Sequence, residues 1–212
     1  MLDLQDMRTE YIQATLDEST VPTDPFLLFE IWFAQAVETQ VKDPNSKILA
    51  TSSKDNIPNI RTVLLKIFDE KGFVFFTNYN SKKAKEIAQN PHVAPEFLWL
   101  DLERQVRVIG TCEKISTSES MSYFMKRSRG SQIGAWVSEQ SSVISSRKIL
   151  QMQIEKMKQK FANGAVPLPD FWGGYRVIPS QIEFWQGRAN RLHDRILYTR
   201  DNDGWSIQRL AP

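Results

Sequence analysis

A change of hydrophobic period near Lys47 constrains the fold of this chain more than any other feature of its sequence. Before it, apolar side chains recur at helical spacing from Leu28 to Val37. After it, short segments rich in β-branched and aromatic residues alternate with turn sequences such as Asp69-Glu70-Lys71-Gly72. Strands outnumber helices and hairpin signals recur. The sequence therefore predicts a mainly β fold with α-helices, in which helices pack outside an antiparallel barrel.

The expected helices cover residues 25–42, 81–90, 117–127 and about 145–163. Asp24 and Pro25 form a typical helix start, and Ser116 and Glu119 have the spacing of a capping box. Apolar faces are expected from two sets of residues: Met121, Phe124 and Met125, and Leu150, Ile154, Met157 and Phe161. Asn163-Gly164 is typical of a helix end at which the residue after the helix adopts the left-handed conformation. The expected strands cover residues 48–51, 59–68, 73–78, 93–99, 104–115, 173–177, 182–185, 195–199 and 205–209, with a hairpin at residues 69–72.

Length and composition bound the other properties. With 212 residues the chain can bury one sizeable core, and we expect a mobile arm over residues 1–22 followed by a single domain over residues 23–212. The formal charge of +2 gives no reason to expect a nucleic-acid or membrane partner. Cys112 is the only cysteine and no signal-peptide pattern is present, so we expect a cytoplasmic protein without disulfides. Two histidines and one cysteine offer no metal site.

The start of the second expected helix is the first candidate site. No glycine-rich phosphate loop is present, so side chains would have to bind a phosphorylated ligand. Ser81 precedes Lys82 and Lys83, two cations that oppose the positive end of the helix dipole. A bound anion would offset that cost. The alternative is that both lysines are solvated surface residues.

Arg61 and Lys66 are further cations, and both fall within one expected strand. Because they are five residues apart, they would face opposite sides of a regular strand and serve different groups. The alternative is an exposed face of the barrel.

Tyr123, Arg127 and Ser131 form a third candidate. Tyr123 and Arg127 lie one helical turn apart, away from the expected apolar face. A guanidinium fork with two hydroxyl donors suits a phosphate monoester. A solvated helix face would also explain the pattern.

Arg191, His193 and Arg195 alternate near the C-terminus and, in an extended segment, would share one face. Two guanidiniums around an imidazole repel each other unless an anion or an electron-rich ring lies there, which favours a functional role over a structural histidine. On composition alone, Trp172 and Trp185 are interpreted as core residues.

Ordered motifs from about Pro25 to the last residue closely resemble the pyridoxine/pyridoxamine 5′-phosphate oxidase family. In chain order they are Arg61-Thr62-Val63-Leu64-Leu65-Lys66, Glu103-Arg104-Gln105-Val106, Ser131-Gln132-Ile133-Gly134-Ala135-Trp136, Gln140-Ser141-Ser142, Pro167-Leu168-Pro169, Phe171-Trp172-Gly173-Gly174, Gln181-Ile182-Glu183-Phe184-Trp185-Gln186, Arg191-Leu192-His193-Asp194-Arg195 and Arg209-Leu210-Ala211-Pro212. The resemblance implies a split antiparallel β-barrel with surrounding helices, FMN as cofactor, and a homodimer with FMN at the subunit interface.

The resemblance also implies site residues. Those expected to bind substrate are Lys66, Tyr123, Arg127, Ser131, Arg191 and His193, with Arg8 and Tyr11 in an N-terminal segment that covers the site. The first four would hold the 5′-phosphate, and Arg191 and His193 would act in catalysis. Those expected to bind FMN are Arg61, Thr62, Val63, Leu64, Leu65, Lys66, Phe76, Thr77, Lys82, Lys83, Gln105, Gln140, Ser141, Trp185 and Arg195. Lys82 and Phe76 stand where Arg and Tyr are common in the family.

The implied activity is oxidation of pyridoxine or pyridoxamine 5′-phosphate to pyridoxal 5′-phosphate, a step of vitamin B6 biosynthesis and salvage. Hydride would pass from C4′ to N5 of FMN, with O2 as electron acceptor giving H2O2, and NH3 released from the amine. Alternatives are a nicotinamide-dependent flavin reductase, a silent FMN- or pyridoxal-phosphate-binding module, and a basic-patch binding protein without cofactor. The pair Arg191 and His193 disfavours the first two, and the near-neutral charge disfavours the third.

Overall fold

The protein is described by a computed structural model over residues 10–202 and 204–212. Arg8, an expected substrate contact, lies outside these residues. Two compact units are present. Unit 1 comprises Met1–Leu49, Ala94–Gly110 and Pro179–Pro212, and unit 2 comprises Ala50–Val93 and Thr111–Ile178.

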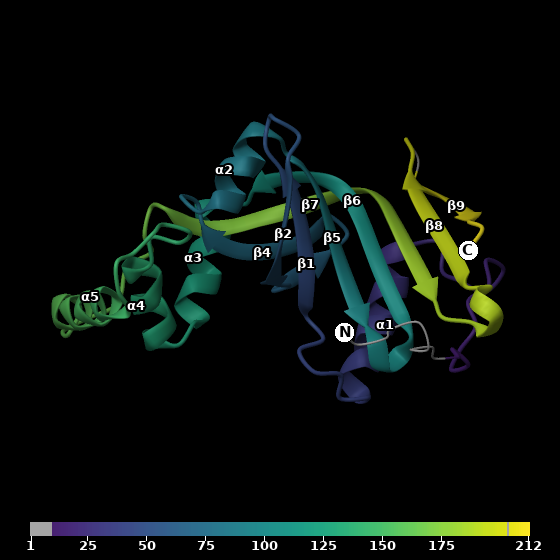
Figure 1. Ribbon diagram of the computed structural model, residues 1–212, viewed down its shortest axis with the longest axis horizontal. Coiled ribbons are helices and arrows are strands. Elements are labelled where there is room, and N and C mark those ends of the chain that lie inside the picture. Colours follow the sequence, from purple (N-terminus) through teal and green to yellow (C-terminus); the bar gives the residue numbers. More distant parts are fainter. Residues whose placement is uncertain (1–9, 203) are drawn as a thin grey trace, which may run out of the picture. The chain divides into compact units, whose positions relative to one another are not determined.

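The described residues form nine strands and five α-helices, which confirms the mainly β fold with helices (Figure 1). The helices are α1 Pro25–Glu38, α2 Lys82–Gln89, α3 Thr117–Lys126, α4 Arg129–Val137 and α5 Arg147–Lys160. The strands are β1 Ser46–Ser52, β2 Pro58–Leu64, β3 Ile67–Asp69, β4 Gly72–Asn78, β5 His92–Trp99, β6 Arg104–Lys114, β7 Trp172–Gln186, β8 Asp194–Arg200 and β9 Trp205–Arg209. Their order in the sheet is β2-β1-β5-β6-β7-β4-β3, with β8 paired to β7 and β9 to β8.

In unit 1, helix α1 begins as the sequence predicts. The Asp24 side chain accepts a hydrogen bond from the Phe26 amide, and Pro25 occupies the first turn. The buried face contacts strand residues, with Phe29 4.9 Å from Phe97 and Trp32 5.2 Å from Phe184 between ring centroids. The helix ends at Glu38, earlier than expected, because Gln40 adopts a left-handed φ of 56° that a continuing helix does not allow.

The described part of the N-terminal segment runs along unit 1. The Leu16 amide donates to Asp194 Oδ2 at 3.1 Å, and Arg209 donates to the Leu16 carbonyl oxygen at 3.0 Å. The Tyr198 hydroxyl donates to the Pro22 carbonyl oxygen at 2.7 Å. These bonds tie residues 16–22 to β8 and β9.

In unit 2, the expected hairpin is present, with Asp69 paired to Gly72 between β3 and β4. The expected strand over residues 59–68 is wrong, because β2 ends at Leu64 and β3 starts at Ile67. Leu65 interrupts the alternation by entering the core, where 4% of it is exposed, and the Lys66 amide donates to the Val74 carbonyl oxygen at 2.9 Å. Arg61 and Lys66 therefore do not share a strand, and the parity argument for opposite faces does not apply.

Strand β7 is continuous from Trp172 to Gln186, where the sequence analysis expected two separate strands. It passes through Pro179 and Ser180 without a break. The backbone pairing of β7 with β4 and with β8 follows from this long strand.

Helices α3, α4 and α5 lie together in unit 2 (Figure 1). The capping box of Ser116 and Glu119 at the start of α3 is confirmed. The expected apolar face of α3 is wrong, because only Phe124 is buried, whereas Met121 and Met125 are 40% and 53% exposed. Helix α4, which the sequence analysis did not predict, begins at Arg129 and is capped by Ser128, whose side chain accepts a hydrogen bond from the Ser131 amide.

The apolar stripe of α5 is confirmed, since Leu150, Ile154 and Met157 pack against a buried cluster that includes Phe161. The expected helix end is wrong. Helix α5 stops at Lys160, whereas Gly164, with a left-handed φ of 120°, lies beyond the capping residue Phe161.

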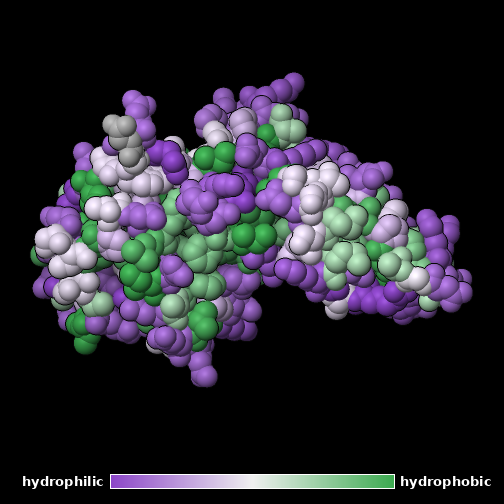
Figure 2. Space-filling view, turned by 180° about the vertical axis from the view of Figure 1, so that it is seen from behind, coloured by the Kyte–Doolittle hydropathy of each residue, from purple (hydrophilic) through white to green (hydrophobic). Residues whose placement is uncertain are grey.

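The surface carries apolar groups among polar ones on the face shown in Figure 2. On β2, Ile60 is 67% exposed and Leu64 is 43% exposed. Within the described residues, the helices are all too short or too polar to span a membrane.

Candidate active site

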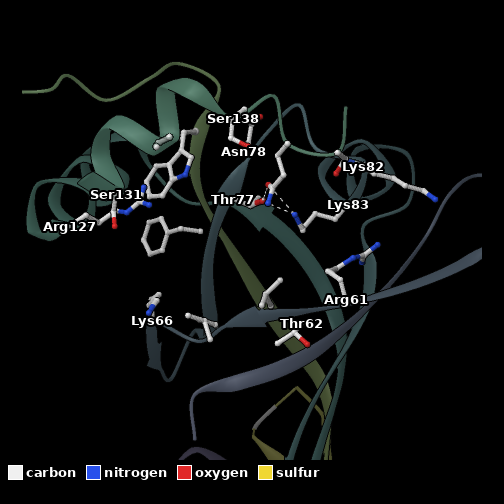
Figure 3. Close-up of a pocket in the computed structure, with 18 of the residues that line it drawn as sticks. Arg61, Thr62, Lys66, Thr77, Asn78, Lys82, Lys83, Arg127, Ser131 and Ser138 are labelled. Carbon is white, nitrogen blue, oxygen red and sulfur yellow. Dashed lines mark hydrogen bonds between the residues drawn. The ribbon is translucent and has the colours of Figure 1, made fainter. Parts of the chain in front are cut away.

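A pocket of about 770 Å³ lies within unit 2, and its lining residues come mainly from β2, β4, α2, α3 and α4 (Figure 3). The expected site residues that line it are Arg61, Thr62, Val63, Leu64, Lys66, Phe76, Thr77, Lys82, Lys83, Tyr123, Arg127, Ser131, Gln140 and Ser141. Its volume is within the usual range for a small-molecule site. Leu65 is buried and is not part of the lining.

The pocket also has lining residues that the sequence analysis missed: Asn59, Ile60, Asn78, Gly134, Ala135, Ser138 and Trp172. Trp172 combines two roles, because it belongs to the buried cluster of unit 2 and also lines the pocket. Its place in the motif Phe171-Trp172-Gly173-Gly174 was the available signal.

Cations lie at two ends of the pocket. Figure 3 shows Arg61, Lys82 and Lys83 at one end and Lys66, Arg127 and Ser131 at the other, with Thr77 between them. We call these the lysine end and the Arg127 end. The pocket thus has two separate places for an anion. Among the residues described, no three His, Cys, Asp or Glu side chains could together hold a metal ion.

At the lysine end, the Lys83 ammonium is buried. Its Nζ donates to Thr77 Oγ1 at 3.0 Å and to Gln140 Oε1 at 3.2 Å. Burial and the neighbouring Arg61 lower the pKa of Lys83 to about 8, although Glu86 acts in the opposite direction. An anion placed here would stabilise the charged form of Lys83.

The first amide of α2 is hydrogen-bonded by a serine side chain that is distant in the sequence. Ser81 occupies the capping position, but its side chain makes no capping hydrogen bond. The Lys82 amide instead donates to Ser141 Oγ at 3.3 Å. Ser141 has a left-handed φ of 76°, an uncommon conformation for a residue other than glycine. A helix start and a strained polar residue therefore meet at the lysine end.

At the Arg127 end, aromatic rings support the guanidinium. The Arg127 guanidinium lies 4.6 Å from the centroid of the Trp172 ring. Phe76 stacks on Tyr123 at 3.9 Å and on Trp172 at 5.4 Å. Burial lowers the pKa of Arg127 and raises the pKa of Tyr123.

Arg127 Nη1 is buried and has no hydrogen-bond partner within the described part of the chain. A buried donor without an acceptor is costly, particularly in a charged group. Arg127 follows the last turn of α3, and Ser131 lies in the first turn of α4, so the junction of the two helices brings them to the same end of the pocket. A phosphate monoester would supply the missing acceptor.

A second group of expected site residues lies within unit 1. The His193 and Trp185 rings are 4.6 Å apart, and Tyr11 packs at 5.7 Å from His193 and 5.8 Å from Trp185. The Arg188 amide donates to His193 Nδ1 at 3.1 Å. Burial and the Arg191 cation lower the pKa of His193, while Asp194 acts in the opposite direction. A neutral imidazole in this arrangement carries its proton on Nε2.

The extended segment on which a shared face of Arg191, His193 and Arg195 depended is not present. Residues Ala189–Arg191 form a short 3-10 turn, in which Asn190 and Arg191 have left-handed φ values of 56° and 61°. Strand β8 begins only at Asp194. The segment is therefore bent where the single-face argument required an extended chain.

Arg195 is held by a buried carboxylate. Its Nε donates to Glu183 at 2.8 Å, and this bond is the main cause that raises the pKa of Arg195. Arg107 pairs with the second oxygen of Glu183. Gln105, the remaining expected contact, is half-buried on β6. The expected site residues thus fall into two groups, one in each unit.

Comparison with known proteins identifies the family. Residues 33–161 match the family model described as pyridoxamine 5′-phosphate oxidase, and residues 172–212 match the pyridoxine 5′-phosphate oxidase C-terminal dimerisation region. Proteins named pyridoxine/pyridoxamine 5′-phosphate oxidase from Crocosphaera subtropica and Aliarcobacter butzleri are 58% and 57% identical, each over 100% of both chains.

Solved structures support the fold. PhzG from Burkholderia lata, in complex with tetrahydrophenazine-1-carboxylic acid, has a TM-score of 0.89 and 26% identity over 95% of this chain and 99% of its own. A pyridoxamine 5′-phosphate oxidase-related, FMN-binding protein from Nostoc punctiforme has a TM-score of 0.71 and 17% identity over 91% of this chain and 99% of its own. The expected split-barrel fold is confirmed. By its sequence over the full length and by its fold, this chain belongs to the pyridoxamine 5′-phosphate oxidase family.

Proposed function

We propose that this protein oxidises pyridoxine 5′-phosphate and pyridoxamine 5′-phosphate to pyridoxal 5′-phosphate, with FMN as cofactor and O2 as electron acceptor. The activity is the one that names the full-length relatives at 57–58% identity. The observation that supports it in the structure is the presence of two cationic ends in one pocket. FMN and the substrate each carry a phosphate monoester, so an oxidase of this class needs two separate phosphate sites.

We assign the lysine end to the FMN phosphate. Lys82 and Lys83 lie at the start of α2, where the helix dipole favours an anion, and Arg61 adds a guanidinium. Thr77, Gln140 and Ser141 supply neutral polar groups in the same place. Thr62, Val63 and Leu64, which line the pocket on β2, would contact the rest of the cofactor.

We assign the Arg127 end to the substrate phosphate. Arg127 presents a buried donor that lacks an acceptor, and Tyr123, Ser131 and Lys66 complete a set of donors suited to a phosphate. This end would fix the substrate by its phosphate, so that the pyridine ring is oriented before reaction. When bound, FMN would accept the hydride from C4′ and pass electrons to O2, giving H2O2.

Arg191 and His193 are proposed to contact the pyridine ring. Because His193 Nδ1 already accepts the Arg188 amide, a neutral His193 would donate from Nε2 to the ring hydroxyl oxygen. In that state it would orient the ring and could not accept a proton at Nε2. Tyr11, packed against His193 and Trp185, is proposed to cover this part of the site.

We propose a homodimer with FMN at the subunit interface. The match of residues 172–212 to a dimerisation region supports the dimer. Ile60 and Leu64 of β2 are apolar and exposed, and a partner subunit would bury them. A cytoplasmic location, expected from the sequence, stays a prediction.

The purified protein tests the proposal directly. We expect a flavin absorption spectrum after addition of FMN, and formation of pyridoxal 5′-phosphate and H2O2 when pyridoxamine 5′-phosphate is added in air. Anaerobic mixing should bleach the flavin without producing H2O2. A protein that binds FMN but leaves both phosphorylated substrates unchanged would contradict the proposed activity.

A further inference from the structure

Helix α2 carries a buried carboxylate beside the lysine end of the pocket. Glu86 is 6% exposed, and its Oε2 accepts from Thr51 Oγ1 at 2.6 Å and from an Arg61 guanidinium nitrogen at 2.9 Å. Its Oε1 accepts from Asn59 Nδ2 at 3.0 Å and lies 4.0 Å from Lys82 Nζ. A buried carboxylate is stable only with such a set of donors.

Arg61 is held by this carboxylate in a closed triangle. Its Nη2 bonds to Glu86, its Nη1 donates to Thr51 Oγ1 at 2.5 Å, and Thr51 in turn donates to Glu86. Two of the three corners, Thr51 and Glu86, are buried. The plane of the guanidinium is therefore set by groups behind it, while Arg61 also lines the pocket.

The charges fit a phosphate. Burial by itself would raise the pKa of Glu86, but the bonds from Thr51, Asn59 and Arg61 outweigh burial and lower it, so Glu86 is ionised at neutral pH. Three cations, Arg61, Lys82 and Lys83, against one carboxylate leave a local charge of about +2, which balances a phosphate monoester of about −2.

We propose that Glu86 is a positioning residue for the cofactor phosphate. It acts through Arg61, by holding the guanidinium in the orientation in which it meets the phosphate, and Thr51 completes the arrangement. The proposal rests on the assignment of the lysine end to the FMN phosphate. A carboxylate that repels the ligand is retained here because an immobile Arg61 loses less side-chain entropy on binding.

The direction in which Glu86→Gln changes the affinity for the phosphate distinguishes a positioning role of Glu86 from a purely electrostatic one. Glu86→Gln removes a negative charge, and on electrostatics alone it would strengthen phosphate binding. If Glu86 orients Arg61, the same change weakens binding instead. If Glu86 contributes only to the stability of the fold, Glu86→Gln would lower the unfolding midpoint and leave the ligand affinity of the folded protein unchanged.

The experiment measures binding of FMN and of riboflavin, which lacks the phosphate, to the protein freed of flavin, by quenching of flavin fluorescence. For Glu86→Gln we expect the Kd of FMN to rise about tenfold, the scale of one charged hydrogen bond, and the Kd of riboflavin to stay within about twofold. Glu155→Gln is the matched control, because Glu155 is a 64% exposed helical glutamate that pairs with Lys158.

The same measurement in an Arg61→Ala background tests whether Glu86 acts through Arg61. There we expect Glu86→Gln to cause no further weakening of FMN binding, because the side chain that it orients is gone. An equal loss in both backgrounds, or tighter FMN binding by Glu86→Gln alone, would overturn the proposal. Thr51→Val, which keeps the ion pair but removes the bridging hydroxyl, gives a second measurement if Glu86→Gln does not fold. We expect a smaller rise of the FMN Kd for it, and an unchanged FMN Kd would count against the triangle.

Failure of the underlying assignment has a different signature. If Arg61→Ala changes the affinities for FMN and riboflavin equally, the FMN phosphate does not lie at the lysine end. If Arg61→Ala weakens FMN selectively while Glu86→Gln has no effect, the assignment stands and only the role of Glu86 is refuted.

Discussion

The Arg127 guanidinium lies against the Trp172 ring at 4.6 Å, with its Nη1 buried and lacking an acceptor among the described residues. The ring holds the guanidinium in place through a cation–π contact and leaves a donor unsatisfied. A site that keeps a charged donor unpaired in this way is prepared for an anion.

Arg127→Ala should weaken binding of the phosphorylated substrate by about 1.5–3 kcal/mol, the scale of a charged hydrogen bond. FMN binding should be unaffected, because Arg127 lies at the opposite end of the pocket from Lys83 (Figure 3). Steady-state kinetics with pyridoxamine 5′-phosphate and a flavin titration measure the two quantities. Lys126→Ala, at an exposed neighbouring position, is the control. If Arg127→Ala weakened FMN binding as much as substrate binding, the assignment of the two phosphate sites would be wrong.

The pH dependence of FMN binding should follow Lys83. Its pKa in the unliganded protein is lowered to about 8, so the ammonium is charged below that pH and is lost as the pH rises through it. FMN affinity should therefore be nearly constant between about pH 7, above which the phosphate monoester is the dianion, and about pH 8, and should fall above that, by at most about tenfold per pH unit. In Lys83→Arg the guanidinium stays charged, and this fall should disappear. A fall that persists unchanged in the arginine variant would assign it to another group.

His193 should be neutral at pH 7 and protonated on Nε2. The hydrogen bond from the Arg188 amide to His193 Nδ1 selects this tautomer, and burial together with Arg191 lowers the pKa of the ring. Imidazole nitrogen-15 spectra give both properties, and the chain has only two histidines to assign. Replacing Arg191 with Ala should raise the pKa of His193 because a nearby cation is removed. A proton on Nδ1 in the free enzyme would contradict this description.

Gly173 should not tolerate a side chain. A Cβ there would lie 2.2 Å from the Tyr79 hydroxyl oxygen and 3.0 Å from Ser120 Oγ, and Tyr79 is itself tied to Gly174 by a hydrogen bond. Gly173→Ala should reduce the free energy of unfolding by about 1–3 kcal/mol, the usual cost of overpacking. Urea unfolding measures this. Gly130→Ala, on α4 with nothing within 4 Å, is the control, and it should be neutral or stabilising. Equal effects of the two changes would remove the steric explanation.

Local signals predicted much of the secondary structure because their causes lie within a few residues. The cap at Asp24, the capping box at Ser116 and Glu119, and the hairpin at Asp69 and Gly72 each depend on neighbouring groups, and all are present. The apolar face of α3 was mispredicted for the opposite reason: burial of Met121 and Met125 depends on what packs over them, which their spacing does not specify.

For the site, the residues and their order in the chain already pointed to the family, since functional groups are recognised by type and sequence context. Tertiary structure decided which of them meet. Burial of Leu65 and pairing of Lys66 with Val74 end β2, and the chain then brings Arg61 and Lys66 to one pocket. The left-handed residues Asn190 and Arg191 redirect the segment before β8, which periodicity could not foresee. The sequence by itself thus determined the chemistry available to this protein. The folded chain decided the geometry, because long-range packing and not local spacing sets which side chains share a pocket.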